Sequence, residues 1–124
     1  MFVNKILLSI KPEYVKHILA GKKKYEFRRK LPQKRIQSIV IYETFPSMMV
    51  VGEVEVISSM AMEPLDLWGF TKQSAGITKD VFLDYFLGCN IAYAYELGEI
   101  MIYDPPKSLL DIGVYTAPQS FVYL

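Results

Sequence analysis

The chain has 124 residues, of which 52% are hydrophobic and 22% charged, a composition that excludes an intrinsically disordered protein and predicts a single domain over residues 1–124. Its one cysteine, Cys89, excludes an internal disulfide and a zinc site built from several cysteines, which favours the reducing cytoplasm. The apolar run at residues 6–8 is too short for a signal peptide, and no run approaches membrane-spanning length, so we expect a soluble protein with no membrane partner.

The net charge of +1 conceals a segregation of charge along the chain. Residues 1–35 contain eleven Lys and Arg against two acids, whereas residues 36–124 contain three Lys against eleven acids. This pattern predicts a dipolar molecule with one basic region. The alternative is that the fold interleaves the two parts and pairs their charges.

The first elements are predicted to be a strand and a helix. Residues 5–10 (KILLSI) form a short apolar run before a turn, which indicates a buried strand. Pro12 favours the start of a helix, and Gly21 favours its end. His17, the only histidine, lies outside the apolar face of this helix, so we expect it to be exposed rather than catalytic. The apolar face consists of Tyr14, Val15, Ile18 and Leu19.

The most basic stretch of the chain follows, at residues 21–35 (GKKKYEFRRKLPQKR), where eight Lys and Arg surround one acid, Glu26. If residues 24–29 form a strand, Tyr25 and Phe27 lie on one face and Glu26 lies with the cations on the other. We expect the aromatic face to contact the core and the basic face to meet an anionic partner.

Two strands are predicted next. Residues 38–43 (SIVIYE) indicate the first, and residues 44–47, which include a proline, indicate a turn. Residues 49–59 indicate a longer strand in which valines alternate with Glu53 and Glu55. Alternating acids are typical of a solvent-facing strand surface, so we assign no chemistry to them.

The following segment is predicted to be helical. Residues 64–69 indicate a short helical turn, and residues 72–77 indicate a loop. Thr78 is suited to the N-cap of a helix that ends at Gly88. The apolar face of this helix is predicted to contain Val81, Phe82, Tyr85 and Phe86.

Residues 91–97 (IAYAYEL) indicate a strand with two alanines, Ala92 and Ala94, on one face. Small side chains there allow close approach of another element or of a ligand, and a packed helix is the more common case. A further strand is predicted at residues 99–103, where Pro105 and Pro106 would stop it, then a turn at 109–112 and a closing strand at 121–124. Strands and helices without a regular repeat predict an α+β fold with a mixed or antiparallel sheet.

The segment from Ser9 to Arg29 resembles the ASCH domain family, whose hallmark is a helix that ends in a Gly-x-Lys-x-x-Glu-x-Arg run. This run is matched by Gly21, Lys23, Glu26 and Arg28. Residues 92–94 and 117–120 also look like later segments of the family. The resemblance implies a PUA-like fold, a small β-barrel of mixed or antiparallel strands with two or three helices packed around it. It also implies a cleft beside the hallmark that binds RNA or a nucleotide.

On this basis we expect the nucleic-acid-binding residues to be Lys11, Lys23, Glu26, Arg28 and Arg29. Lysine and arginine neutralise phosphates, and aromatic side chains stack on unpaired bases. Glu26 could accept hydrogen bonds from a base edge, or it could hold Lys23 and Arg28 in place through ion pairs. No cofactor and no metal site is predicted, and nothing in the pattern selects an oligomeric state.

Two other hypotheses remain. Some ASCH proteins are enzymes, and one branch resembles amidohydrolases acting on acylated cytidine, with a lysine that activates a threonine and a separate glutamate. Lys23 matches that lysine, but Glu26 stands where the threonine would be, and residues 68–77 contain no carboxylate. The second hypothesis is therefore a small hydrolase of a modified nucleoside or of RNA, in which Lys23 and Glu26 are the catalytic acid and base. The third is a module whose basic strand binds an acidic protein surface.

Overall fold

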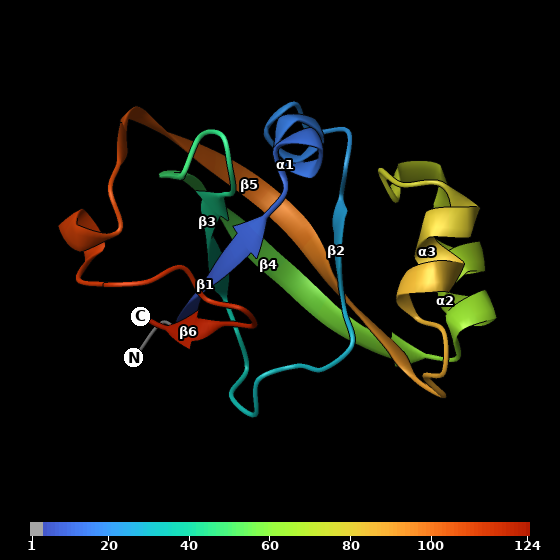
Figure 1. Ribbon diagram of the computed structural model, residues 1–124. Helices are drawn as coiled ribbons and strands as arrows, with labels where there is room; N and C mark the ends of the chain where they lie inside the picture. Colours follow the sequence, from blue (N-terminus) through green and yellow to red (C-terminus); the bar gives the residue numbers. More distant parts are fainter. Residues whose placement is uncertain (1–3) are drawn as a thin grey trace.

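In the computed structural model, residues 4–124 form one six-stranded sheet with three α-helices (Figure 1). The strand order is β2-β5-β4-β3-β1-β6. The strands are β1 (Lys5–Ile10), β2 (Tyr25–Arg28), β3 (Ser38–Glu43), β4 (Met49–Met62), β5 (Ala92–Lys107) and β6 (Val122–Tyr123). The helices are α1 (Pro12–Leu19), α2 (Pro64–Thr71) and α3 (Lys79–Tyr85), with 3-10 turns η1 (Lys72–Ser74) and η2 (Leu110–Ile112).

The sheet is mixed, as the sequence predicts. β1 pairs with β3 in parallel, and the other neighbouring strands pair antiparallel. The long strands β4 and β5 cross the whole molecule and curl, so the sheet forms a half-barrel with β2 and β6 as its edges (Figure 1). The α+β prediction is confirmed, and the predicted small barrel is present in this half-open form.

The main core lies inside the curl, under α1. Ile6 and Leu8 of β1 pack there against Val15 and Ile18 of α1, and Ile39 of β3 joins them. All five side chains are almost completely buried. The apolar face predicted for α1 therefore holds this helix over one end of the half-barrel.

A second core lies between the sheet and the pair α2 and α3. Ala92 and Ala94 of β5 are fully buried there, and Phe82 of α3 packs against them. The ring centroids of Phe82 and Phe27 lie 5.0 Å apart in an edge-to-face arrangement. The close approach that two alanines allow is thus used by a helix. Val81 departs from the prediction, because it is 45% exposed rather than packed in this core.

The predicted boundaries of β4 and β5 are wrong. Residues 91–97 and 99–103 were predicted to be separate strands, but they belong to one strand, β5, which also continues through Pro105 and Pro106 to Lys107. β2 pairs with β5 only at residues 93–96, and β4 pairs with Ile102 and then with Lys107, across a register shift. Neither proline has a partner in either ladder, so their missing N–H groups interrupt no pairing. β4 also extends beyond the predicted residue 59 to Met62, because its final residues pair with the start of β5.

Candidate functional site

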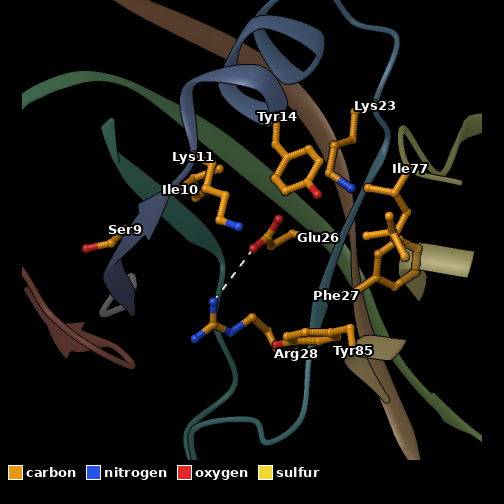
Figure 2. A pocket seen from close by; sticks show the side chains of 11 residues that line it. Ser9, Ile10, Lys11, Tyr14, Lys23, Glu26, Phe27, Arg28, Ile77 and Tyr85 are labelled. Atoms are coloured by element: carbon orange, nitrogen blue, oxygen red, sulfur yellow. Dashed lines mark ion pairs between the residues drawn. The ribbon is translucent and has the colours of Figure 1, made fainter. Parts of the chain in front are cut away.

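A cavity of about 270 Å³ opens between the end of β1 and β2, and residues of α1 and α3 also line it (Figure 2). β1 pairs with β3 and β6, and β2 pairs with β5, so β1 and β2 do not share a ladder. The cavity therefore occupies the opening of the half-barrel. We call it the cleft; its lining residues are Ser9, Ile10, Lys11, Tyr14, Lys23, Glu26, Phe27, Arg28, Ile77, Val81 and Tyr85.

The alternation of β2 determines which side chains face the cleft. Phe27 pairs with Ala94 and turns towards the core beneath α3, whereas Glu26 pairs with Tyr95 and points into the half-barrel. Arg28 lies on the same face as Glu26. The predicted division of this strand into an aromatic and a charged face is confirmed, and the charged face lines a concave site.

Lys23 enters the cleft just before β2 begins and is only 3% exposed. Its ammonium donates a hydrogen bond to the Ala75 carbonyl oxygen, with a distance of 2.7 Å between Nζ and O. The ammonium also lies 5.4 Å from the centre of the Tyr14 ring and 4.8 Å from that of Phe27. Burial lowers the pKa of Lys23, while the charge of Glu26 opposes this shift.

The carboxylate of Glu26 lies in the middle of the cleft, between Lys23 and Arg28 (Figure 2). Glu26 is 8% exposed, and burial raises its pKa, against the opposing charges of Lys23 and Arg28. Its Oε2 lies 3.7 Å from Nη1 of Arg28. One predicted role of Glu26 is to hold both Lys23 and Arg28 through ion pairs. Among residues 4–124 it forms an ion pair with Arg28 but not with Lys23.

The C-terminal segment holds the two sides of the cleft together. The Ser9 hydroxyl donates a hydrogen bond to the Pro118 carbonyl oxygen, at 2.8 Å. Nη2 of Arg28 donates to the Ser120 carbonyl oxygen, at 3.2 Å. The segment thus links the end of β1 to β2, and it fixes one end of the Arg28 guanidinium.

Four of the five predicted binding residues line the cleft: Lys11 at its exposed rim, Lys23, Glu26 and Arg28. Arg29 does not line it. β2 ends at Arg28, and the Nε of Arg29 donates instead to the Tyr85 carbonyl oxygen at 2.7 Å, with its guanidinium 4.4 Å from the centre of the Tyr85 ring.

Sequence reasoning missed the other wall of the cleft. Tyr14 was assigned to the apolar face of α1, and Tyr85 to that of α3, yet both line the cleft. Tyr14 lies three residues after Lys11 at the start of a helix, a spacing that places both on one side and could have identified it. Ile77 and Val81 reach the cleft only through tertiary packing, for which the sequence has no local signal.

The basic part of the chain is largely unpaired with the acidic part. Among residues 4–124, one ion pair joins the two, between Lys5 Nζ and Glu53 Oε2 at 2.9 Å. Glu53 also accepts hydrogen bonds from Ser38 and Tyr103. The fold therefore does not neutralise the predicted basic region by internal pairing.

Within the described part of the chain, no three His, Cys, Asp or Glu side chains gather as a metal site would require. None of the helices in residues 4–124 has the length and apolar character needed to cross a membrane.

Comparison with known proteins identifies relatives of this fold. The family model of the ASCH domain matches residues 8–101. An ASCH domain-containing ribonuclease of Zymomonas mobilis is 33% identical over 92 residues, which cover 73% of this chain and 62% of that protein. The crystal structure of ASCH from Zymomonas mobilis superposes with a TM-score of 0.88 and 29% identity, covering 97% of this chain and 87% of that one. A large ribosomal subunit protein of Ureaplasma parvum is 26% identical over 96% of this chain, which spans 39% of that protein.

Proposed function

The chain belongs to the ASCH domain family, and we propose that it binds single-stranded RNA in the cleft between β1 and β2. One of its relatives is named a ribonuclease. The proposal retains a cytoplasmic location, which the single cysteine favours.

The observation that carries the proposal is the convergence of Lys11, Lys23 and Arg28 around Glu26 in one cavity. At about 270 Å³, the cleft is near the lower limit of ordinary ligand pockets, so it suits a single nucleotide of an unpaired strand rather than a duplex. The exposed ammonium of Lys11 at the rim is placed to contact a phosphate, while the rings of Tyr14 and Tyr85 offer stacking surfaces.

The proposal is tested by measuring the fluorescence anisotropy of a labelled single-stranded RNA over a series of salt concentrations. We expect affinity to fall steeply with salt, and the Lys11→Gln variant to reduce the slope of log affinity against log salt by about 0.7, the value for one phosphate contact on a single strand. Lys16→Gln is the matched control, because Lys16 is an exposed lysine of α1 that does not line the cleft. Absence of RNA binding at low salt would refute the proposal.

A second candidate function is cleavage of the RNA strand, with Lys23 and Glu26 as the reactive pair. It is favoured by the opposite directions of their pKa shifts: burial lowers the pKa of Lys23 and raises that of Glu26, which brings both nearer to neutral pH. In this reaction Glu26 would remove the proton of a 2′-hydroxyl as its oxygen attacks the adjacent phosphate. Lys23 would donate a proton to the departing 5′-oxygen.

Product analysis by gel electrophoresis separates the two candidates. If the protein cleaves RNA, Lys23→Met and Glu26→Gln should each abolish the products while Lys16→Gln retains them. RNA that is bound but recovered intact supports a binding domain without catalysis. Binding of an acidic protein in place of RNA, resistant to nuclease treatment, would instead support the third hypothesis.

A further inference from the structure

The cleft contains an arrangement that a phosphate site does not need. A buried carboxylate repels phosphate, so a site for phosphate alone would not place Glu26 among the cations Lys11, Lys23 and Arg28. A nucleobase is neutral, and its edge presents donors and acceptors that a carboxylate and two cations can match. The buried part of the cleft is therefore suited to a base, and the exposed rim near Lys11 to the phosphate attached to it.

Three of the polar side chains that line the cleft occur in a fixed order. Lys23 is a donor, Glu26 an acceptor and Arg28 a donor, and Figure 2 shows the carboxylate between the two cations. Lys23 uses one of its three donors on the Ala75 carbonyl, while Arg28 donates from Nη2 to Ser120 and turns Nη1 towards the Glu26 carboxylate, out of five donors in all. Each cation therefore keeps further N–H groups for a ligand.

This order matches one of the four RNA bases at all three positions. The Watson–Crick edge of uracil presents O4, N3–H and O2, that is acceptor, donor, acceptor. Cytosine and adenine place an acceptor at the centre, where it would face the Glu26 carboxylate. Guanine matches through O6 and N1–H, but its amino group would face the guanidinium of Arg28. We propose that the cleft selects uracil, with the Glu26 carboxylate accepting N3–H and Lys23 and Arg28 donating to its two carbonyl oxygens.

The burial of the cleft strengthens the discrimination between uracil and the other bases. Lys23 and Glu26 are almost fully buried, so a wrong base leaves a polar group unpaired where water cannot replace the partner. The ring of Tyr14 and the side chain of Ile77 provide apolar walls on which a base can lie. Tyr14 also carries a hydroxyl, which can donate or accept and so does not oppose this assignment.

This inference rests on the RNA binding proposed above, and it is not compatible with catalysis by the same pair. Lys23 and Glu26 cannot both hold a base edge and exchange protons with the sugar and phosphate. Uracil selection by these residues therefore supports the binding function over strand cleavage.

The test is competition against a labelled single-stranded RNA by the four ribonucleoside 5′-monophosphates and by N3-methyluridine 5′-monophosphate. We expect uridine monophosphate to compete at concentrations at least about tenfold lower than the cytidine and adenosine nucleotides, with guanosine between them. N3-methylation removes the hydrogen that Glu26 accepts, so it should abolish this advantage. This comparison uses the wild-type protein only and does not depend on a variant that folds.

A variant arm assigns the selection to Glu26. Glu26→Gln presents both a carbonyl and an amino group, so the preference for uridine over cytidine should shrink towards equality. Glu55→Gln, which changes an exposed carboxylate of β4 outside the cleft, is the matched control and should keep the preference. RNA binding with equal competition by all five nucleotides, or with N3-methyluridine as effective as uridine, would overturn uracil selection and leave RNA binding intact. If the labelled RNA does not bind at all, the proposed function itself fails.

Discussion

Replacement of Gly76 by alanine should damage the cleft without touching a ligand. Gly76 has a φ of 71°, and a Cβ built on it would lie 2.5 Å from Cγ and 2.6 Å from Cβ of Lys23. These distances are shorter than any stable contact, so the stem of Lys23 must move. Because Lys23 is anchored by its hydrogen bond to the neighbouring Ala75 carbonyl, displacement of the stem breaks that bond.

Gly21→Ala is the matched control for this substitution. Gly21 has a φ of 75°, and a Cβ there would meet no atom within 4 Å. Both variants therefore share the backbone cost of a left-handed alanine, about 1–2 kcal/mol. Only Gly76→Ala also loses the charge-assisted hydrogen bond of buried Lys23, which contributes about 1.5–3 kcal/mol. The free energy of unfolding of Gly76→Ala should therefore be lower than that of Gly21→Ala by the contribution of this hydrogen bond.

Urea unfolding followed by circular dichroism measures the difference in stability, and anisotropy with single-stranded RNA measures binding under native conditions. We expect Gly76→Ala to be the less stable of the two and to bind RNA more weakly, while Gly21→Ala retains wild-type affinity. Equal stability and equal affinity of the two variants would refute the anchored position of Lys23.

Two further predictions concern stability. Burial raises the pKa of Glu26 above its ordinary value of 4.5. Between pH 4.5 and the pKa of Glu26 in the folded protein, the folded state therefore binds more protons than the unfolded state. The contribution of Glu26 to the free energy of unfolding must then fall as pH rises through this range. As pH rises through this range, the urea midpoint should therefore decline more for the wild-type protein than for Glu26→Gln. If the two midpoints differ by the same amount at every pH, the raised pKa of Glu26 is contradicted. Thr78 caps α3 by accepting a hydrogen bond from the Val81 amide at 3.3 Å, so Thr78→Ala should lower the free energy of unfolding by about 1 kcal/mol. Thermal or urea unfolding measures this loss, and an unchanged midpoint would show that the cap contributes nothing.

The sequence is sufficient to predict which residues line the β2 side of the cleft. Lys23, Glu26 and Arg28 lie within six residues, so the alternation of a strand is sufficient to place Glu26 and Arg28 on one face. The helix before them has a proline at its start, a glycine after its end and an apolar face, all recognisable in the sequence, and it forms as predicted. Local rules were therefore adequate for this half of the site.

The opposite wall and the ends of the strands depend on tertiary contacts. Tyr85 lines the cleft because α3 packs over Ala92 and Ala94, and the direction of Arg29 is decided by the nearby Tyr85 carbonyl. The link from Arg28 to Ser120 joins residues that are 92 positions apart. β5 runs as one strand because β4 pairs with it on both sides of Gly98, and this pairing has three register shifts that no local pattern indicates.

The most direct test of the central claim is a map of the RNA-binding surface by amide chemical shifts in NMR. Titration with a short single-stranded RNA should shift the amides around the cleft, above all those of Lys11, Tyr14, Lys23, Glu26 and Arg28. The acidic surface of β4 around Glu53 and Glu55 should remain unchanged and serves as the internal reference. Shifts that leave the cleft unchanged and gather elsewhere on the protein would contradict the claim that this opening of the half-barrel is where RNA binds.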